Sequence, residues 1–322
     1  MLKKMTIKRI LVTISGIMAL LLVSIIPKET TYDLKDLKQK LEYVNNSIET
    51  SEIYLLNKNN LLAKSKVSVN SNEEDIEKKS YELLEYLIIE SKLSSKIPSG
   101  FKAYLPEGTE IKSLKWENKV LKVDFSEKIL DVTKIMEEKI IEGIIYTLTS
   151  IKEVENIIIY VEGSILTKLP KSGIILPSTL NRTIGINKEY KMSSYKNINK
   201  VTVYYLDTFN DETYYIPVTK YLNDEREKID IIIEELSGNT SYNTNLMSYL
   251  NSNTKLMSYN KQDDKMDLVF NQYILDDMDE KKILEEVVYT IALSVRDNYN
   301  VKEVSFKVDK EEIVKSVIKN IE

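Results

Sequence analysis

The chain has 322 residues and a net charge of −5, and it contains neither His nor Cys. Those two absences exclude His-dependent catalytic triads, Cys nucleophiles, disulfides, Cys/His zinc sites and iron–sulfur clusters. Hydrophobic residues make up 43% and charged residues 30% of the chain, as in globular proteins, and no basic footprint for nucleic acid stands out. We therefore expect two folded domains, without a catalytic, cofactor or metal site.

The first 28 residues predict a membrane anchor. Four basic residues lie within the first nine positions, and a predominantly apolar run follows at residues 10–26. This order keeps the N-terminus in the cytoplasm, and the run is at the short limit for a spanning helix. The alternative is a cleaved signal peptide, but residues 23–27 contain no small-x-small cleavage site. We favour an uncleaved signal anchor, and both interpretations place the rest of the chain outside the cytoplasm.

Residues 29–50 read as a charged juxtamembrane tether. Leu34, Leu37 and Leu41 have helical spacing, so a short helix is an alternative to a solvated spacer, which we favour. Beyond the tether, residues 53–56 and 61–69 predict two strands around an Asn-rich turn.

A helix is predicted to follow these strands, because Ser71 and Glu74 have the spacing of a capping box. Its apolar face comprises Ile76, Leu83, Leu84, Leu87 and Ile88.

The next stretch, residues 104–131, occurs again without gaps at residues 249–276. Such a recurrence indicates that one structural unit is used twice. In both places alternating apolar residues on either side of a short turn predict a β-hairpin. The identical pairs are Tyr104/Tyr249, Leu105/Leu250, Thr109/Thr254, Ser113/Ser258, Phe125/Phe270, Ile129/Ile274, Leu130/Leu275 and Asp131/Asp276.

The flanking segments repeat in the same order, so each copy reads β-β-α-β-β-α-β. After the first hairpin we expect a helix over residues 132–150 and a buried strand over 155–161. The second copy adds expected strands at 201–206, 213–218 and 301–308 and helices at 225–236 and 281–298.

One-sided apolar helices need a sheet to cover, which predicts an α+β fold, a mixed sheet with two helices on one face. The predicted division is anchor 1–28, tether 29–50, first repeat 51–163, connector 164–200, second repeat 201–310 and a short packed C-terminal helix 311–322.

The repeated unit resembles the GerMN domain of the GerM family of sporulation and germination proteins. The resemblance covers roughly residues 51–310 and includes the two-copy layout, which is more specific than any single motif. The matching residues in the first copy are Leu105-Pro106-Glu107-Gly108-Thr109, Val120, Val123-Asp124-Phe125-Ser126 and Tyr146-Thr147-Leu148. Those in the second copy are Glu235-Leu236-Ser237-Gly238, Asn253-Thr254-Lys255-Leu256 and Tyr289-Thr290-Ile291, and residues 180–190 resemble the family's connector.

This resemblance implies a non-enzymatic protein of the cell membrane, single-pass, with its C-terminal domains outside the cytoplasm. It also implies a ring-building-motif-like fold, and a role in the channel complex between mother cell and forespore, with other sporulation membrane proteins or further copies as partners. Two departures stand out. Family members are often lipoproteins attached through Cys, which this chain lacks, and the second copy has Asn251-Ser252-Asn253 where the first has Pro-Glu-Gly.

The densest carboxylate cluster is Asp276, Asp277, Asp279 and Glu280. A hard cation could be bound by such oxygens, but the sequence has no EF-hand glycine turn. We therefore interpret the cluster as an acidic start to a helix from Lys281, stabilised by the helix dipole.

The remaining candidate residues have structural interpretations that we prefer. The pairs Tyr204-Tyr205 and Tyr214-Tyr215 could line a binding surface, or reflect the strand propensity of Tyr. Trp116 is expected to pack on its hairpin, and Asp263-Asp264 to form a turn.

Arg182 in the connector has two interpretations. It could pair with a carboxylate across the domain junction, or it could be solvated.

Two other functions remain open from the residues alone. One is an envelope module that binds a germinant or a peptidoglycan fragment through the tyrosine-rich hairpins. The other is a wall hydrolase, which needs two carboxylates roughly 5–9.5 Å apart across a cleft.

Overall fold

The computed structural model describes residues 50–70, 75–238, 246–309 and 311–317. The predicted anchor, tether and capping box lie outside these residues. Within them, no helix is both long and apolar enough to cross a membrane. All described elements belong to one compact unit, Ile48–Glu322.

The first copy runs from β1 to β7. Its elements are β1 (Thr50–Asn57), β2 (Leu62–Ser68), α2 (Ile76–Leu87), β3 (Phe101–Lys102), β4 (Ile111–Glu117), β5 (Val120–Phe125), α3 (Lys134–Leu148), β6 (Asn156–Val161) and β7 (Ser164–Ile165). The 3-10 helix η1 (Ser94–Lys96) precedes β3, and η2 (Glu127–Leu130) precedes α3. The N-cap of α2 is Asp75, whose side chain accepts a hydrogen bond from the Lys78 N–H.

The second copy repeats this order after a connector that carries η3 (Arg182–Ile184) and β8 (Glu189–Lys191). Its elements are β9 (Ile198–Phe209), β10 (Glu212–Asn223), α4 (Lys228–Ser237), β11 (Leu256–Gln262), β12 (Lys265–Phe270), η4 (Gln272–Ile274), α5 (Glu285–Tyr299), β13 (Glu303–Val308) and β14 (Glu311–Val317).

The recurring stretch found in the sequence has the same structure in both places. Strands β11 and β12 each begin and end 145 residues after β4 and β5. Even the β-bulge recurs, between Ile111 and Ser113 in β4 and between Leu256 and Ser258 in β11. In both copies the second strand of the hairpin pairs in parallel with the strand that follows the second helix. The mixed α+β architecture with tandem repeats is therefore confirmed.

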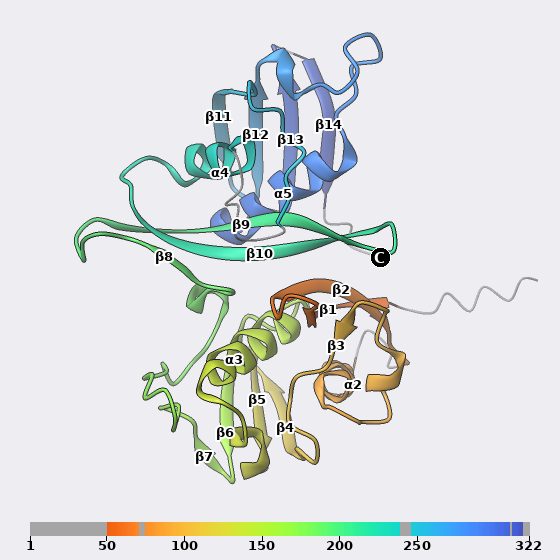
Figure 1. The fold of residues 1–322 in the computed structure, drawn as a ribbon, viewed down its shortest axis with the longest axis vertical. Helices are drawn as coiled ribbons and strands as arrows, with labels where there is room; N and C mark the ends of the chain where they lie inside the picture. Colours follow the sequence, from red (N-terminus) through yellow and green to blue (C-terminus); the bar gives the residue numbers. More distant parts are fainter. Residues whose placement is uncertain (1–49, 71–74, 239–245, 310, 318–322) are drawn as a thin grey trace, which may run out of the picture. The chain divides into compact units, whose positions relative to one another are not determined.

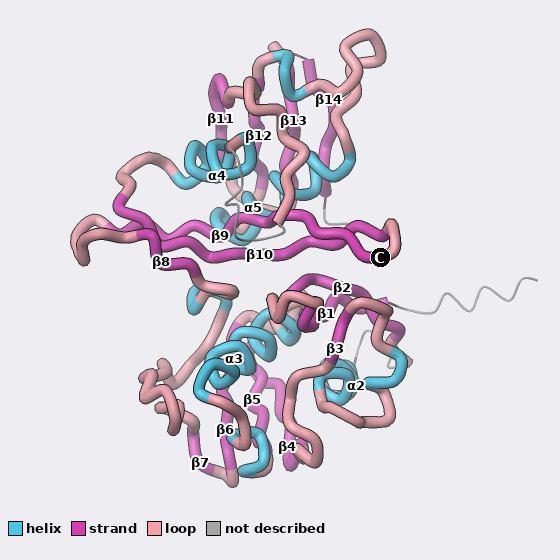
Figure 2. The backbone as a smooth tube through the Cα atoms, viewed as in Figure 1, coloured by secondary structure: helices cyan, strands magenta, loops and turns pink. Residues whose placement is uncertain are grey.

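Each copy has a third layer that the sequence did not predict (Figures 1 and 2). The mixed sheets are β4-β5-β6-β7 and β11-β12-β13-β14, whereas the opening hairpins β1–β2 and β9–β10 belong to another sheet with β3 and β8. The second helices explain this arrangement: every residue of α3 from Ile140 to Leu148 is buried. A helix covered all round needs a layer on both sides, and the hairpin is the second one.

The helices also protect the outer edges of these hairpins. On β1 the Tyr54 N–H donates to Thr147 Oγ1, and on β9 the Thr202 N–H donates to Asn298 Oδ1, at 3.0 and 3.1 Å. The Tyr204 N–H donates to Ser294 Oγ at 2.9 Å. These edge N–H groups, which could otherwise pair with a strand of another chain, are thus hydrogen-bonded to helix side chains.

The structure corrects two predicted helices near the C-terminus. Residues 311–317 form β14, antiparallel to β13, and not a packed helix. Apolar pairs such as Ile313-Val314 are compatible with a helix or a strand. The strand forms because its backbone N–H and C=O groups pair in register with those of β13. The helix expected from Lys281 begins at Glu285 as α5.

Candidate functional site: the connector between the two copies

The connector contacts both copies through its backbone. In the first copy Leu180 exchanges two backbone hydrogen bonds of 2.8 Å with Ile157 of β6. Asn181 then caps η3, because its side chain accepts from the Thr183 N–H at 2.9 Å. In the second copy β8 pairs in parallel with β10. The segment between these two anchors therefore crosses the junction.

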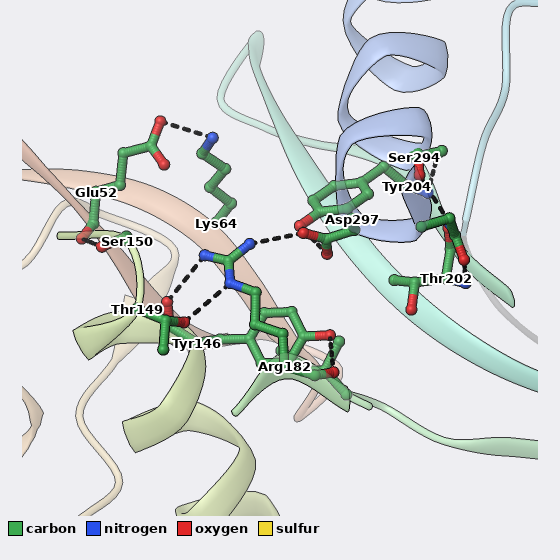
Figure 3. A network of polar contacts seen from close by, with 12 residues as sticks. Glu52, Lys64, Tyr146, Thr149, Ser150, Arg182, Thr202, Tyr204, Ser294 and Asp297 are labelled. Atoms are coloured by element: carbon green, nitrogen blue, oxygen red, sulfur yellow. Dashed lines mark hydrogen bonds and ion pairs between the residues drawn. The ribbon is translucent and has the colours of Figure 1, made fainter. Parts of the chain in front are cut away.

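Arg182 makes a forked contact there (Figure 3). Its Nη1 donates to Asp297 Oδ1 of α5 at 2.7 Å, and its Nε donates to Thr149 Oγ1 after α3 at 2.9 Å. The Arg182 side chain is 27% exposed and that of Asp297 is 8% exposed. The guanidinium thus joins the end of the first copy's second helix to the second copy's second helix. Partly desolvated forked contacts of this kind are stronger than surface pairs.

Three tyrosines surround this ion pair. The Arg182 guanidinium carbon lies 4.8 Å from the centre of the Tyr146 ring and 5.7 Å from that of Tyr54. The Tyr204 hydroxyl donates to Asp297 Oδ2 at 2.8 Å and lies 3.1 Å from the Tyr54 hydroxyl. Burial, and then the charge of Asp297, raises the pKa of Tyr204 well above its usual value. The hydroxyl therefore stays protonated and able to donate.

Gly185 lets the chain turn away from η3 toward β8. Its φ is +83° and its ψ is 175°, a conformation open essentially to glycine alone. A Cβ at this position would lie 2.9 Å from Thr219 Cγ2 of β10. Both the torsion and the close approach therefore require glycine.

Replacing Gly185 with alanine is expected to cost about 3 kcal/mol or more of stability, because backbone strain of roughly 1–3 kcal/mol adds to the clash. Gly108 is the matched control: it also has a positive φ, +75°, but nothing lies within 4 Å of its Cβ position. Gly108→Ala should cost only about 1–2 kcal/mol. Urea unfolding of both variants measures the difference, and equal losses would contradict the role given to Thr219.

Asn187 joins a strand of each copy. Its Oδ1 accepts from the Leu62 N–H of β2 at 3.0 Å, and its Nδ2 donates to the Leu62 and Pro217 carbonyls, both at 2.8 Å. Pro217 belongs to β10. The one register pair between β10 and β2 is Tyr215 with Lys64. Asn187 therefore extends the contact between β2 and β10 beyond the reach of their own pairing. It is 8% exposed.

Lys188, the next residue, is held by the first copy. Its Nζ lies 2.5 Å from Glu138 and 3.4 Å from Glu142, both on α3. Burial raises the pKa of Glu142, whereas Lys188 and the Asn187 N–H act in the opposite direction. Burial opposes the charge on Lys188, but the neighbouring carboxylates outweigh it and raise the pKa of Lys188. The pair is thus a buried charge contact that depends on both partners.

On the second copy, a polar cluster lies beside β8. Glu235 of α4 accepts hydrogen bonds from the Lys220 ammonium and from the Tyr205 hydroxyl. Burial disfavours the charge on Glu235, but Lys220 outweighs burial and lowers the pKa of Glu235 below its usual 4.5. The carboxylate is therefore stabilised in the folded state.

This cluster predicts an acid-sensitive contribution to stability. Because the folded pKa of Glu235 is depressed, its contribution is present above about pH 4.5 and is lost as the pH falls through the folded pKa. Glu235→Gln should therefore flatten the stability profile below pH 4.5. Urea midpoints measured between about pH 3 and 7 test this, with the exposed Glu234→Gln as control; parallel profiles for Glu235→Gln and the unsubstituted chain would refute the assignment.

Two interpretations of Arg182 were open from the sequence. The structure confirms that it pairs with a carboxylate across the domain junction. The tyrosine pairs do not form an open surface: Tyr204 and Tyr205 are 1% exposed and Tyr214 is 7% exposed. Tyr215 is half-buried, with its ring centre 5.8 Å from that of Tyr289. The tyrosine-rich hairpin therefore fills the interior rather than presenting a ligand surface.

The acidic cluster at residues 276–280 precedes a helix less closely than expected. It lies in the loop before α5 and ends at Glu280, five residues before the helix begins at Glu285. The Asp277 carboxylate accepts from the Asp279 and Glu280 N–H groups, both at 2.8 Å. Its interpretation as a dipole-stabilised helix start is wrong, because the helix begins too late. Among the described residues there is no cluster of three or more Asp or Glu side chains that could hold a metal ion.

The other two candidates are structural. Trp116 packs against the core of the first copy, and its indole N–H donates to the Glu153 carbonyl at 3.2 Å. Asp263 and Asp264 form the turn between β11 and β12, and Asp263 has a φ of +50°.

A hollow of about 290 Å³ beside α4 bears on hydrolysis, because Asp224, Glu234 and Glu235 line it. Each of these carboxylates is in an ion pair, the first two with Arg226 and the third with Lys220. The pKa values of Asp224 and Glu235 are lowered, that of Asp224 first by its hydrogen bond to Arg226. Asp224 and Glu235 are thus stabilised as carboxylates, the opposite of what a glycosidase requires of its acid.

The sequence did not single out Asn187 or Asp297. Asn187 lies within the connector motif, where its position two residues after Gly185 was the available signal. Asp297 lies 115 residues beyond Arg182, on the polar side of a helix, and nothing local marks it.

The comparisons with known proteins agree with this architecture. A family model described as "Sporulation and spore germination", Germane, matches residues 52–167 and 202–314, which is more than half of the chain and covers both copies. The chain belongs to the Germane family. This Germane chain is 32% identical to the spore germination protein GerM of Bacillus subtilis over 270 residues, 82% of the chain and 72% of that protein.

The tandem arrangement of this Germane protein has a solved counterpart. The structure of the tandem GerMN domains of the sporulation protein GerM from Bacillus subtilis matches with a TM-score of 0.74 and 29% identity. The match covers 82% of this chain and 92% of that structure. The Germane protein described here is thus GerM-like, with two GerMN domains in tandem.

Proposed function

We propose that this protein is a non-enzymatic, membrane-anchored scaffold that acts outside the cytoplasm during endospore formation. It supports the channel complex between mother cell and forespore through contacts with other sporulation membrane proteins or with further copies of itself. The family membership supports a role in sporulation, and the predicted anchor at residues 10–26 supports a location at the membrane.

The observation that carries this proposal is the connector. Residues 180–191 bond to both copies through a partly desolvated ion pair, a buried amide and a parallel strand. These contacts fix the two domains with respect to each other, because each is desolvated and directional. A fixed pair of domains presents its outer surfaces at a constant spacing, which is what an assembly factor needs.

Deletion of the gene in a spore former tests the proposal. We expect arrested engulfment or reduced late gene expression in the forespore, restored by the unsubstituted chain. A chain with Arg182→Ala and Asn187→Ala should restore development poorly at equal abundance, whereas one with the exposed Asn197→Ala should restore it fully. Normal development in the deletion strain would refute the proposal.

A further inference from the structure

The two copies differ at one edge of their mixed sheets. In the first copy the chain that continues β7 is itself covered, because the Leu176 N–H donates to the Thr167 carbonyl and the Leu169 N–H donates to the Ile174 carbonyl, at 2.8 and 2.9 Å. Residues 174–176 thus form a further extended segment outside β7. In the second copy β14 is the last described strand of its sheet, with no described strand beyond it (Figure 1).

The segment and the residues 167–169 with which it pairs also close the core of the first copy. Leu169 and Leu176 are 1% and 4% exposed and belong to the core cluster against which Leu130 and Val161 pack. The turn that precedes residues 174–176 is held at the start of α3, because the Lys171 and Ser172 N–H groups donate to the Glu137 carboxylate at 2.7 and 2.5 Å. An extended apolar segment is therefore an integral part of this fold.

Beside β14 the second copy has a cavity of about 570 Å³. Leu275 and Val308, which correspond to Leu130 and Val161 by the repeat and by strand register, line it. Met278 of the acidic loop at residues 276–280 and Ile313 of β14 complete its apolar part. The first copy thus carries an additional extended segment next to the chain that continues β7, whereas the second copy has an edge strand without a described neighbour and a partly apolar cavity beside it.

Charge around this cavity is mostly negative. Asp309 and Glu311 line it, and Glu312 and the acidic loop of residues 276–280 flank it. Lys281, Lys282 and Lys315 offset Glu311, Glu280 and Glu312, with which they pair, so the remaining negative charge is that of Asp309 and the aspartates of the loop. An incoming segment with positive charge is therefore favoured over one with negative charge.

We propose that the outer edge of β14 and this cavity accept an extended segment of a partner protein, with apolar side chains at alternate positions and net positive charge. Backbone hydrogen bonds to the strand edge supply affinity, and the cavity selects the apolar side chain that enters it. A second copy is a poorer occupant, because its own matching segment at residues 174–176 is already used in its first copy. The inference rests on the proposed scaffold function and names one surface for it.

Binding of a synthetic peptide to the full-length chain in detergent micelles tests this inference. The probe is a labelled peptide with the sequence of residues 166–178, which carries two Lys and no acidic residue. Fluorescence anisotropy should show saturable binding, and a peptide with Ile174→Asp and Leu176→Asp should bind at least tenfold more weakly. Absence of saturable binding up to about 1 mM peptide overturns the inference.

Two substitutions locate the site. Ile313→Glu places a carboxylate in the cavity and should weaken peptide binding at least tenfold, and Met278→Lys, at a side chain that is 56% exposed, serves if the first variant melts early. Met257→Glu on β11, the opposite edge of the same sheet, is the matched control and should bind normally. Equal loss in the control, or normal binding by both cavity variants, overturns the assignment.

Sedimentation of the chain alone separates the possible occupants. If Ile313→Glu dissolves an oligomer that the peptide also disrupts, the occupant is a second copy and the partner assignment is overturned. The deletion experiment remains independent: if development needs the protein but the peptide does not bind, the scaffold proposal stands and this inference fails.

Discussion

Replacing Asn187 with alanine is expected to lower the free energy of unfolding by about 3–5 kcal/mol. The substitution leaves the Leu62 N–H and the Leu62 and Pro217 carbonyls without their partner, and each buried unpaired group costs roughly 1–3 kcal/mol. The three groups together would cost about 3–9 kcal/mol, and water that enters the space left by the side chain reduces this sum to its lower part.

The same variant should also separate the unfolding of the two copies. Trp116, the only Trp, reports on the first copy, whereas far-UV circular dichroism reports on both. The two urea transitions should coincide in the unsubstituted chain and diverge in Asn187→Ala. Asn197 is the matched control, because it is exposed and shares the left-handed backbone, with φ of 54° against 47° for Asn187. Coincident transitions and a loss below about 1 kcal/mol in Asn187→Ala would contradict the role of this side chain.

The second large effect is expected from the pair of Arg182 and Asp297. Removing either partner leaves a charge in a poorly solvated place, which costs about 3–5 kcal/mol for fully buried pairs. Because the Arg182 side chain is 27% exposed, we expect about 2–3 kcal/mol for Asp297→Ala and for Arg182→Ala. The double variant should lose less than the sum of the two.

A double-mutant cycle measures this coupling, which we expect to be about 1–3 kcal/mol. The cycle for Arg226 and Asp224 is the control: the Arg226 side chain is 50% exposed, so its coupling should be below about 1 kcal/mol. Equal coupling in the two cycles would mean that Arg182 contributes no more than a surface pair.

Local patterns predicted the repeated elements well. Phe125 and Phe270 lie on the buried faces of strands 145 residues apart, and the two hairpins share the same register, including the bulge. The order of elements follows because each is specified by its own apolar period and turn residues.

What the local patterns could not predict is how elements pair at long range. The opening hairpins leave the mixed sheets because α3 and α5 are covered on two sides, which depends on the packing of whole layers. The tail forms β14 because β13 offers it an edge, although the same apolar residues fit a helix. Asp297 acquires its role only when folding brings it to Arg182.

The sheet that contains both opening hairpins, β1–β2 and β9–β10, has an internal symmetry. The strands β2 and β10 occupy the same place in their two copies, and they meet antiparallel at the middle of the order β1-β2-β10-β9. Equivalent surfaces that face each other in this way are the hallmark of a two-fold dimer. Here both halves lie on one chain, so their pairing is intramolecular and does not depend on protein concentration. A protein made in a few copies per cell can therefore keep its two domains joined where a separate pair would dissociate.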